Sequence, residues 1–267
     1  MALSPLVARY DHVILDLDGT VWIGDAATPR APEAIAAIRA ADKGLAFVTN
    51  DSGRTPEEYV RKLWSIGCTA SIDEVVSVGS AIQFVLADRE PGAGVFVIGS
   101  PAIVRHVADA GHRILNQTAT AESADVVVIA GHDELTFAEL RTAHRAVLAG
   151  AEMICAGRDR SYPTTGGPAP GTGAIVAALE YATGASARNV GKPDPQVFNV
   201  AVERLGDGRA LVIGDHLASD LGGASAAGLD AAIVLSGITT ADDAREAREP
   251  APVAVAADLG TLVLSAR

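Results

Sequence analysis

Short runs of apolar, mostly β-branched residues alternate with alanine-rich stretches along most of the chain. The runs are continuously apolar, which is the pattern of strands in a parallel sheet that is covered by helices on both faces. This pattern predicts strands at residues 12–17, 45–49, 75–78, 95–99, 126–130, 152–156, 211–214 and 231–235. We therefore predict an α/β protein with a doubly wound, Rossmann-like parallel sheet.

The stretches between the runs carry helix start and stop signals. Thr55 offers an N-cap, a proline follows it, and Glu58 completes a capping box. Thr136 and Glu139 repeat the box before a second helix. The helix that starts after Thr55 is expected to end near Gly67, because glycine commonly follows a helix C-terminus.

The chain has two candidate domain boundaries. Glycine and proline cluster between residues 163 and 173, and a second boundary is expected near Gly79-Ser80. The interval between them has strands and helices of its own. We therefore predict a core made of residues 1–80 and 170–267, with an α/β cap domain, residues 81–169, inserted into it.

Composition excludes several classes of protein. Of the 267 residues, 49% are hydrophobic and 20% are charged, which is a globular composition. The net charge of −12 lacks the basic footprint of a nucleic-acid binder. The N-terminus resembles no signal peptide, and no apolar stretch is long enough to cross a bilayer. We expect a cytoplasmic protein with neither nucleic acid nor membrane as a partner.

Two carboxylates follow the first apolar run. Asp16 and Asp18 belong to the segment Asp16-Leu17-Asp18-Gly19-Thr20. The carboxyl ends of parallel strands line the groove of such a sheet, so both acids can face one substrate. One carboxylate can bind Mg²⁺ and attack phosphorus, and the other can exchange protons with the leaving group and water. A solvated turn is the alternative for an acid pair taken alone.

A second acidic pair follows a later apolar run. Asp215 comes after Gly214, and Asp220 lies near the start of a helix. Asp215 can complete an oxygen-ligated Mg²⁺ site. Asp220 can bind the ion directly, bind it through water, or orient the groups that do. An aspartate that only caps a helix fits this segment equally well in isolation.

Two further strand ends carry groups suited to phosphate. Lys192, in Gly191-Lys192-Pro193, can neutralise the charge of a phosphate and of a carboxylate nucleophile. Thr49 and Asn50 end another strand, where the hydroxyl and backbone amides can hold phosphate oxygens. A solvated lysine and a plain turn are the simpler interpretations of each when it is taken alone.

In their order and spacing these four motifs resemble the haloacid dehalogenase (HAD) superfamily. The matching segments are Asp-x-Asp-Gly-Thr at 16–20, Thr-Asn at 49–50, Gly-Lys-Pro at 191–193 and Gly-Asp-x-x-x-Ser-Asp at 214–220. The resemblance covers essentially the whole chain. The segments at 49–54, 162–163 and 170–173 are similar to subclass IIA, the p-nitrophenylphosphatase, phosphoglycolate and glycerol-3-phosphate phosphatase type. This subclass carries a C2-type α/β cap between its second and third motifs, where the insertion is predicted.

The resemblance implies which residues carry the chemistry. Asp16 would be the nucleophile and a Mg²⁺ ligand. Asp18 would be the general acid/base, with its backbone carbonyl on the metal. Asp215 would be the remaining carboxylate ligand, and Asp220 would support the water shell of the ion.

The resemblance also implies a phosphate-binding set. Thr49 and Lys192 would bind the transferring phosphoryl group, with Asn50 beside them. Phosphoryl transfer depends mainly on in-line positioning and charge neutralisation, which a lysine and a metal ion supply.

The chain departs from the pattern of the family at several positions. Asp51 adds a negative charge near the phosphate loop. His216 stands where many relatives carry Arg or Asn, and as a neutral imidazole it can simply line the pocket. Arg158 and Asp159 stand where relatives commonly show a Thr-Asn-x-Asp pattern; an exposed turn is the alternative there. We expect Arg158, Asp159 and His216 to be the residues that select the substrate.

Together these expectations define a Mg²⁺-dependent phosphoric monoester hydrolase that forms a phospho-aspartate on Asp16. The expected substrates are small phosphorylated metabolites of the glycerol 3-phosphate or 2-phosphoglycolate type, with p-nitrophenyl phosphate accepted in vitro. A phosphomutase of the same superfamily and a non-catalytic phosphometabolite-binding protein are the alternatives. Loss of Asp16 or Asp18 would mark the second of these, and both residues are present. A homodimer is compatible with the sequence, which decides neither the oligomeric state nor the physiological substrate.

Overall fold

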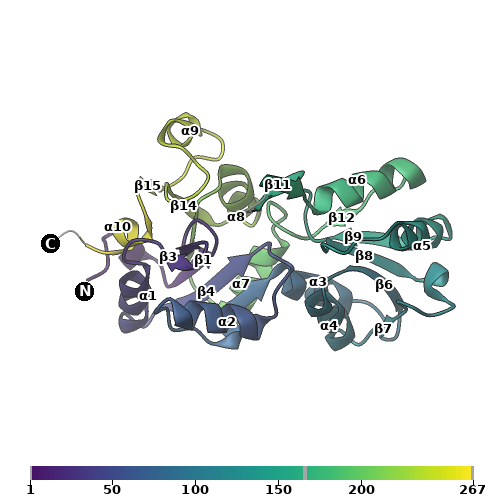
Figure 1. The fold of residues 1–267 in the computed structure, drawn as a ribbon. Helices are drawn as coiled ribbons and strands as arrows, with labels where there is room; N and C mark the ends of the chain where they lie inside the picture. The colour runs from purple at the N-terminus through teal and green to yellow at the C-terminus, as the bar shows by residue number, and fades with distance from the viewer. Residues whose placement is uncertain (1, 165–166, 266–267) are drawn as a thin grey trace. The chain divides into compact units, whose positions relative to one another are not determined.

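The computed structural model describes residues 2–164 and 167–265, which form two compact units (Figure 1). Unit 1 consists of the chain up to residue 49, residues 55–77 and the chain from residue 192 onward. Unit 2 consists of residues 50–54 and 78–191.

Unit 1 is built on a sheet of six parallel strands. Their order is β15 (Ala254–Ala256), β14 (Asp230–Val234), β13 (Ala210–Gly214), β1 (His12–Asp16), β4 (Gly44–Thr49) and β5 (Val75–Ser77). From β1 the chain runs outward to β4 and β5, then returns to β13 on the other side of β1 and runs outward again. The strand order therefore reverses between β1 and β13, the point at which open α/β sheets form a binding crevice.

Helices cover both faces of this sheet. On one face, α1 (Ala31–Ala40), α2 (Pro56–Ser65) and α10 (Leu259–Val263) share a core with Leu15 and its neighbours. Outside that core, α7 (Gln196–Leu205) packs against β4 and α8 (Gly223–Ala226) against β14. Ile14 and Leu15 are both fully buried because each face of the sheet is covered. The predicted doubly wound parallel sheet is confirmed.

The remaining elements of unit 1 are short. They are η1 (Val7–Arg9), the antiparallel pair β2 (Trp22–Ile23) and β3 (Ala26–Ala27), η2 (Ile72–Glu74), the π-helical turn η4 (Leu217–Gly222) and α9 (Ala241–Glu246). The first and last coloured segments of Figure 1 both belong to this unit, and Leu3 pairs with Leu264.

Helix α2 follows its predicted signals. Thr55 Oγ1 accepts a hydrogen bond from the backbone N–H of Glu58, whose carboxylate in turn accepts one from the N–H of Thr55. Tyr59 and Leu63 lie one turn apart and are buried against the core. The helix ends at Ser65, and Gly67 adopts a positive φ of 83°. The predicted capping box and helix end are confirmed.

Unit 2 has a second parallel sheet and a core of its own. The strand order is β12 (Arg188–Asn189), β9 (Glu152–Cys155), β8 (Val126–Gly131), β6 (Gly94–Gly99) and β7 (Arg113–Ile114). The helices are α3 (Val78–Ala87), α4 (Pro101–Asp109), η3 (Ala121–Ser123), α5 (Phe137–Leu148) and α6 (Thr172–Thr183). A separate antiparallel pair consists of β10 (Ser161–Thr164) and β11 (Gly167–Pro170).

The border between the units lies at other positions than predicted. Unit 2 extends to residue 191 and not to 169, because β12 pairs with β9 and α6 packs against β8. Within the glycine- and proline-rich stretch, residues 163–164 and 167–170 belong to the pair β10–β11 and α6 starts at Thr172, whereas Thr165 and Gly166 lie outside the described residues. Residues 50–54 also belong to unit 2, since Ser52 Oγ donates to the carbonyl of Ala130 at 2.9 Å.

The eight strands predicted from the apolar runs are all present, and the described residues contain seven further short strands that this prediction did not include. Each missed strand has two to four residues, too few to show a periodicity. Among the helices of residues 2–164 and 167–265, none is long and apolar enough to span a membrane.

Candidate active site

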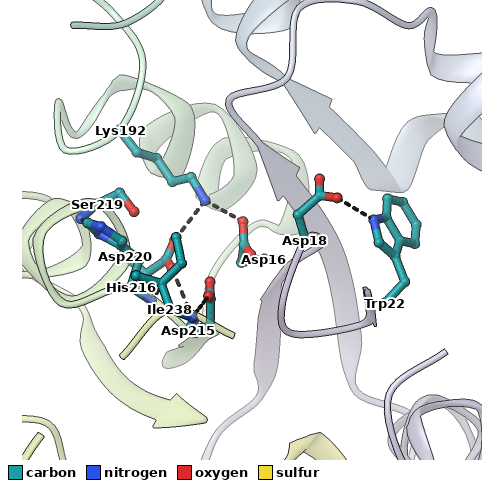
Figure 2. A network of polar contacts seen from close by, with 9 residues as sticks. All are labelled: Asp16, Asp18, Trp22, Lys192, Asp215, His216, Ser219, Asp220 and Ile238. Atoms are coloured by element: carbon teal, nitrogen blue, oxygen red, sulfur yellow. Dashed lines mark hydrogen bonds and ion pairs between the residues drawn. The ribbon is translucent and has the colours of Figure 1, made fainter. Parts of the chain in front are cut away.

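A buried cluster of carboxylates surrounds one lysine at the reversal point of the sheet in unit 1 (Figure 2). Asp16 is the last residue of β1, Asp215 follows β13, and Asp220 lies in η4. Carboxylate oxygens of the three lie within 4.8 Å of one another. The three residues are 6%, 3% and 1% exposed. The structure thus brings the first and fourth motifs together.

Lys192 joins two of these carboxylates. Its Nζ donates to Asp16 Oδ1 at 2.5 Å and to Asp220 Oδ1 at 2.7 Å. Burial alone would lower the pKa of the Lys192 ammonium, but the charges of Asp16 and Asp220 outweigh it, so the pKa is raised. Lys192 is therefore held as a cation beside Asp16.

Asp220 is held on both of its oxygens. Its Oδ1 accepts the hydrogen bond from Lys192 Nζ. Its Oδ2 accepts hydrogen bonds from the backbone N–H groups of Asp215 at 3.2 Å and of His216 at 3.0 Å. A Cβ on Gly214 would lie 2.3 Å from Asp220 Cγ, so glycine is required there for this close approach. Of the three roles left open for Asp220, this arrangement favours orienting its neighbours over binding an ion directly.

Asp215 is held by a loop that sequence reasoning missed. Its Oδ2 accepts the backbone N–H of Ile238 at 2.7 Å, and Ser236 Oγ donates to the carbonyl of Gly19 at 2.6 Å. A Cβ would lie 2.5 Å from Asp215 Oδ2 if added to Gly19, and 1.8 Å if added to Gly237. The available signal was the position of Ser236 and Gly237 directly after a strand, at the same edge of the sheet as Asp16.

Asp18 lies on the turn that follows β1. Gly19, with a φ of 85°, allows this turn, and its N–H donates to the carbonyl of Trp22 at 2.7 Å. The side chain of Asp18 is exposed, and its carboxylate points toward Trp22 (Figure 2). Trp22 Nε1 donates to Asp18 Oδ1 at 2.7 Å. Like the loop around Asp215, Trp22 was not predicted from the sequence.

The predicted phosphate-binding residues divide between the units. Thr49 ends β4, is 3% exposed, and follows Val48, which pairs with Asp16. Thr49 is thus on the strand next to Asp16, at the same end of the sheet. Asn50 begins the segment that belongs to unit 2, where its Oδ1 would lie 3.1 Å from a Cβ on Gly191.

The additional charge of Asp51 has a local partner. Arg54 Nη1 lies 2.6 Å from Asp51 Oδ2, and the N–H of Gly53 donates to Asp51 Oδ1. This ion pair closes a turn within residues 50–54. Asp51 therefore adds no net charge to the segment.

The three predicted substrate-selecting residues differ in their surroundings. His216 caps η4, because its Nδ1 accepts the N–H of Ser219 at 3.0 Å. Arg158, in unit 2, donates from both Nη atoms to Glu180 and from Nη2 to the carbonyl of Ala187. These contacts give Arg158 a structural role and weaken its case as a substrate-selecting residue. Asp159 is exposed.

The acidic cluster fits a hard divalent cation. Burial raises the pKa of Asp16 well above its usual value, and repulsion from Asp220 and Asp215 adds to this, although the attraction of Lys192 acts in the opposite direction. Burial likewise raises the pKa of Asp215. Oxygen ligands gathered this closely suit Mg²⁺, whose charge would remove the repulsion between them. Because Gly19 and Gly237 have no Cβ, the backbone can pack closely around the Asp215 carboxylate and hold it in this cluster.

Comparison with known proteins identifies the family. A family model described as haloacid dehalogenase-like hydrolase matches residues 13–113, and a second HAD-hydrolase-like model matches residues 189–262. The chain is 37% identical to the D-glycerol 3-phosphate phosphatase of Mycobacterium tuberculosis, over 91% of this chain and 67% of that protein. It is 31% identical to an acid sugar phosphatase of Staphylococcus aureus, over 91% of this chain and 93% of that protein.

The chain belongs to the haloacid dehalogenase-like hydrolases. The crystal structure of a glycerol phosphate phosphatase from M. tuberculosis in complex with magnesium superposes with a TM-score of 0.89. The two sequences are 36% identical, and the superposition covers 96% of this chain and 77% of the chain of the M. tuberculosis protein. The predicted membership of the HAD superfamily is confirmed.

Proposed function

We propose that this HAD-like hydrolase is a Mg²⁺-dependent phosphatase that hydrolyses small phosphomonoesters through a phospho-aspartate on Asp16. The observation that carries the proposal is the contact of Lys192 with Asp16, beside Asp215 and Asp220. The nucleophile thus has a fixed cation on Oδ1, while its other oxygen is left to attack phosphorus. The similarity to named phosphatases supports hydrolysis over the phosphomutase and the non-catalytic alternatives.

In the first half of the reaction, Asp16 Oδ2 attacks phosphorus and the bond from phosphorus to the ester oxygen breaks. The carboxyl group of Asp18 gives its proton to that oxygen, so the alcohol leaves neutral. Lys192 and the Thr49 hydroxyl neutralise and hold the phosphoryl oxygens, and the part of Asn50 in phosphate binding stays a prediction. The product on the enzyme is an acyl phosphate on Asp16.

In the second half, water attacks the phosphorus of the acyl phosphate. The Asp18 carboxylate takes one proton from that water, and inorganic phosphate leaves as the carboxylate of Asp16 is regenerated. Mg²⁺, when held by Asp16, Asp215 and the backbone carbonyl of Asp18, supplies positive charge that reduces the repulsion between the phosphate and Asp16. Asp220 keeps Lys192 and the backbone at Asp215 in place.

The substrate is a small phosphorylated metabolite. The relatives named for glycerol 3-phosphate and for acid sugars support a polyol or sugar-type phosphomonoester, with 2-phosphoglycolate and p-nitrophenyl phosphate as further candidates. Unit 2 would act as the cap that limits the size of the substrate. Asp159 and His216 remain candidates for substrate selection. A cytoplasmic location and a homodimeric assembly stay predictions.

The test is the release of phosphate from glycerol 3-phosphate and p-nitrophenyl phosphate, measured with Mg²⁺ and with EDTA. Wild-type protein should be active only with the metal. Asp16→Asn should lose more than about a thousandfold in kcat, because the amide is no nucleophile. Asp258→Asn is the matched control, since Asp258 caps α10 and asparagine caps equally well. Activity retained in a folded Asp16→Asn protein would overturn the assignment of the nucleophile.

A further inference from the structure

The exposed carboxylate of Asp18 takes its orientation from a buried indole. Trp22 Nε1 donates to Asp18 Oδ1 at 2.7 Å, and the Trp22 side chain is fully buried (Figure 2). No described residue donates to the other carboxylate oxygen, Oδ2. We propose that Trp22 is a positioning residue that fixes Asp18 so that Oδ2 carries the proton exchanged with substrate and water.

The backbone makes this contact rigid. The N–H of Gly19 donates to the carbonyl of Trp22 at 2.7 Å, and the N–H of Trp22 donates to the carbonyl of Leu17 at 3.1 Å. Asp18 and Trp22 also form a β-bridge. An exposed aspartate would ordinarily sample several rotamers. Here the turn holds Asp18 next to an indole ring that core packing keeps in a single orientation.

A cation lies on the face of the same ring. Lys62 Nζ, on α2, is 4.3 Å from the centroid of Trp22. A positive charge over an indole is attracted to its π-electrons and draws electron density away from the N–H, which makes the N–H a better donor. Lys62, Trp22 and Asp18 therefore form a chain in which the first group strengthens the contact between the other two.

This positioning matters most when the leaving oxygen is strongly basic, so the inference rests on the proposed phosphatase function. The alkoxide of glycerol needs a proton as the ester bond breaks, whereas p-nitrophenolate leaves readily without one. Loss of the indole N–H should therefore impair hydrolysis of an alkyl phosphate more than hydrolysis of p-nitrophenyl phosphate.

The contact itself is tested by NMR, without turnover. The chain has two tryptophans, so in the Trp64→Phe variant the only remaining indole N–H resonance is that of Trp22. Adding Asp18→Ala should move this resonance upfield, because a hydrogen bond to a carboxylate deshields the proton. Asp18 is exposed, so its substitution leaves the core intact. An unchanged resonance would overturn the proposal.

The kinetic test compares kcat/KM for glycerol 3-phosphate and p-nitrophenyl phosphate at saturating Mg²⁺. Trp22→Phe should lower the first about tenfold and the second less than about threefold. Trp64→Phe is the matched control: Trp64 also donates from its indole, to the carbonyl of Ala70, but it has no contact with Asp18. It should leave both values within about twofold.

Lys62→Met keeps a long side chain on the ring, removes the charge, and should lower kcat/KM for glycerol 3-phosphate about threefold. This variant carries the kinetic test if Trp22→Phe does not fold, as judged by thermal unfolding. Equal losses on both esters, or no loss on either, would overturn the positioning role. A wild-type protein inactive on both esters would instead overturn the proposed function, and the inference with it.

Discussion

Lys192 Nζ lies 2.7 Å from Asp220 Oδ1, and both side chains are almost completely buried. The same ammonium contacts Asp16, so one lysine joins an acid of the first motif to an acid of the fourth. Three buried carboxylates around a single cation leave a negative excess, which a divalent cation would neutralise. The contact between Lys192 and Asp220 therefore helps to fix Lys192 beside Asp16, and the remaining negative charge favours binding of a divalent cation.

The role of Asp220 can be separated from that of a metal ligand. Asp220→Asn keeps the size of the side chain and removes the charge that faces Lys192. We expect kcat to fall by about a hundredfold or more, while the Mg²⁺ concentration for half-maximal activity changes less than about threefold. The measurement is activity against Mg²⁺ concentration, with Asp258→Asn as the control. Activity restored by high Mg²⁺ would show that Asp220 is a direct ligand.

Gly19→Ala should remove activity by displacing Asp215. The new methyl group would lie 2.5 Å from Asp215 Oδ2, and the positive φ of Gly19 adds strain. Gly24→Ala is the matched control, since Gly24 also has a positive φ but no atom within 4 Å of an added Cβ. Both variants should lose about 1–2 kcal/mol of unfolding free energy. Only Gly19→Ala should lose activity as well. Equal activity in both variants would contradict the inference that close approach of Gly19 holds the Asp215 carboxylate in place.

Arg158→Gln should act on stability and not on substrate choice. It removes the ion pair with Glu180 and the hydrogen bond to Ala187, which together tie the segment after β9 to α6 and to the approach to β12. We expect unit 2 to lose about 1 kcal/mol in chemical denaturation. The ratio of kcat/KM between glycerol 3-phosphate and p-nitrophenyl phosphate should stay within about twofold of wild type. A larger change in that ratio would return Arg158 to the substrate-selecting residues.

The Arg39–Glu74 ion pair should make stability depend on pH. Burial alone would raise the pKa of Glu74, but hydrogen bonds from Arg39 and from the N–H of Ser71 outweigh it and lower the pKa. The stabilisation is therefore complete above the unfolded pKa and is lost as pH falls through the lower, folded pKa.

Glu74→Gln should accordingly cost about 1–2 kcal/mol of unfolding free energy at neutral pH. The difference from wild type should shrink toward zero at about pH 3. Urea unfolding at both pH values measures it. Glu122→Gln is the control, because its pair with Arg145 is about half exposed and should contribute less than about 0.5 kcal/mol. A cost for Glu74→Gln that persists at low pH would show that charge is not its cause.

Much of the site was predictable because its residues follow long, buried strands. Asp16 and Thr49 end strands that are continuously apolar, and parallel strands bring their carboxyl ends to one edge. The contribution of Ser236 and Ile238 was not predicted, although both follow the strand β14. Their contacts are made by a side-chain hydroxyl and a backbone N–H to segments more than twenty residues away along the chain, and no local pattern indicates such pairs.

By itself, the sequence determined the doubly wound sheet, the capped helices and the order of the four motifs, because each of these depends on patterns of residues that are close together along the chain. Only the tertiary structure decided that unit 2 runs to residue 191, since the pairing of the two-residue strand β12 with β9 is what assigns it to the sheet of unit 2. Only the tertiary structure showed that the indole of Trp22 donates to Asp18 and that the guanidinium of Arg158 donates to Glu180. The physical reason is the same in each case: hydrophobic periodicity specifies which face of an element is buried, whereas the direction and partner of a polar side chain depend on what the fold brings next to it.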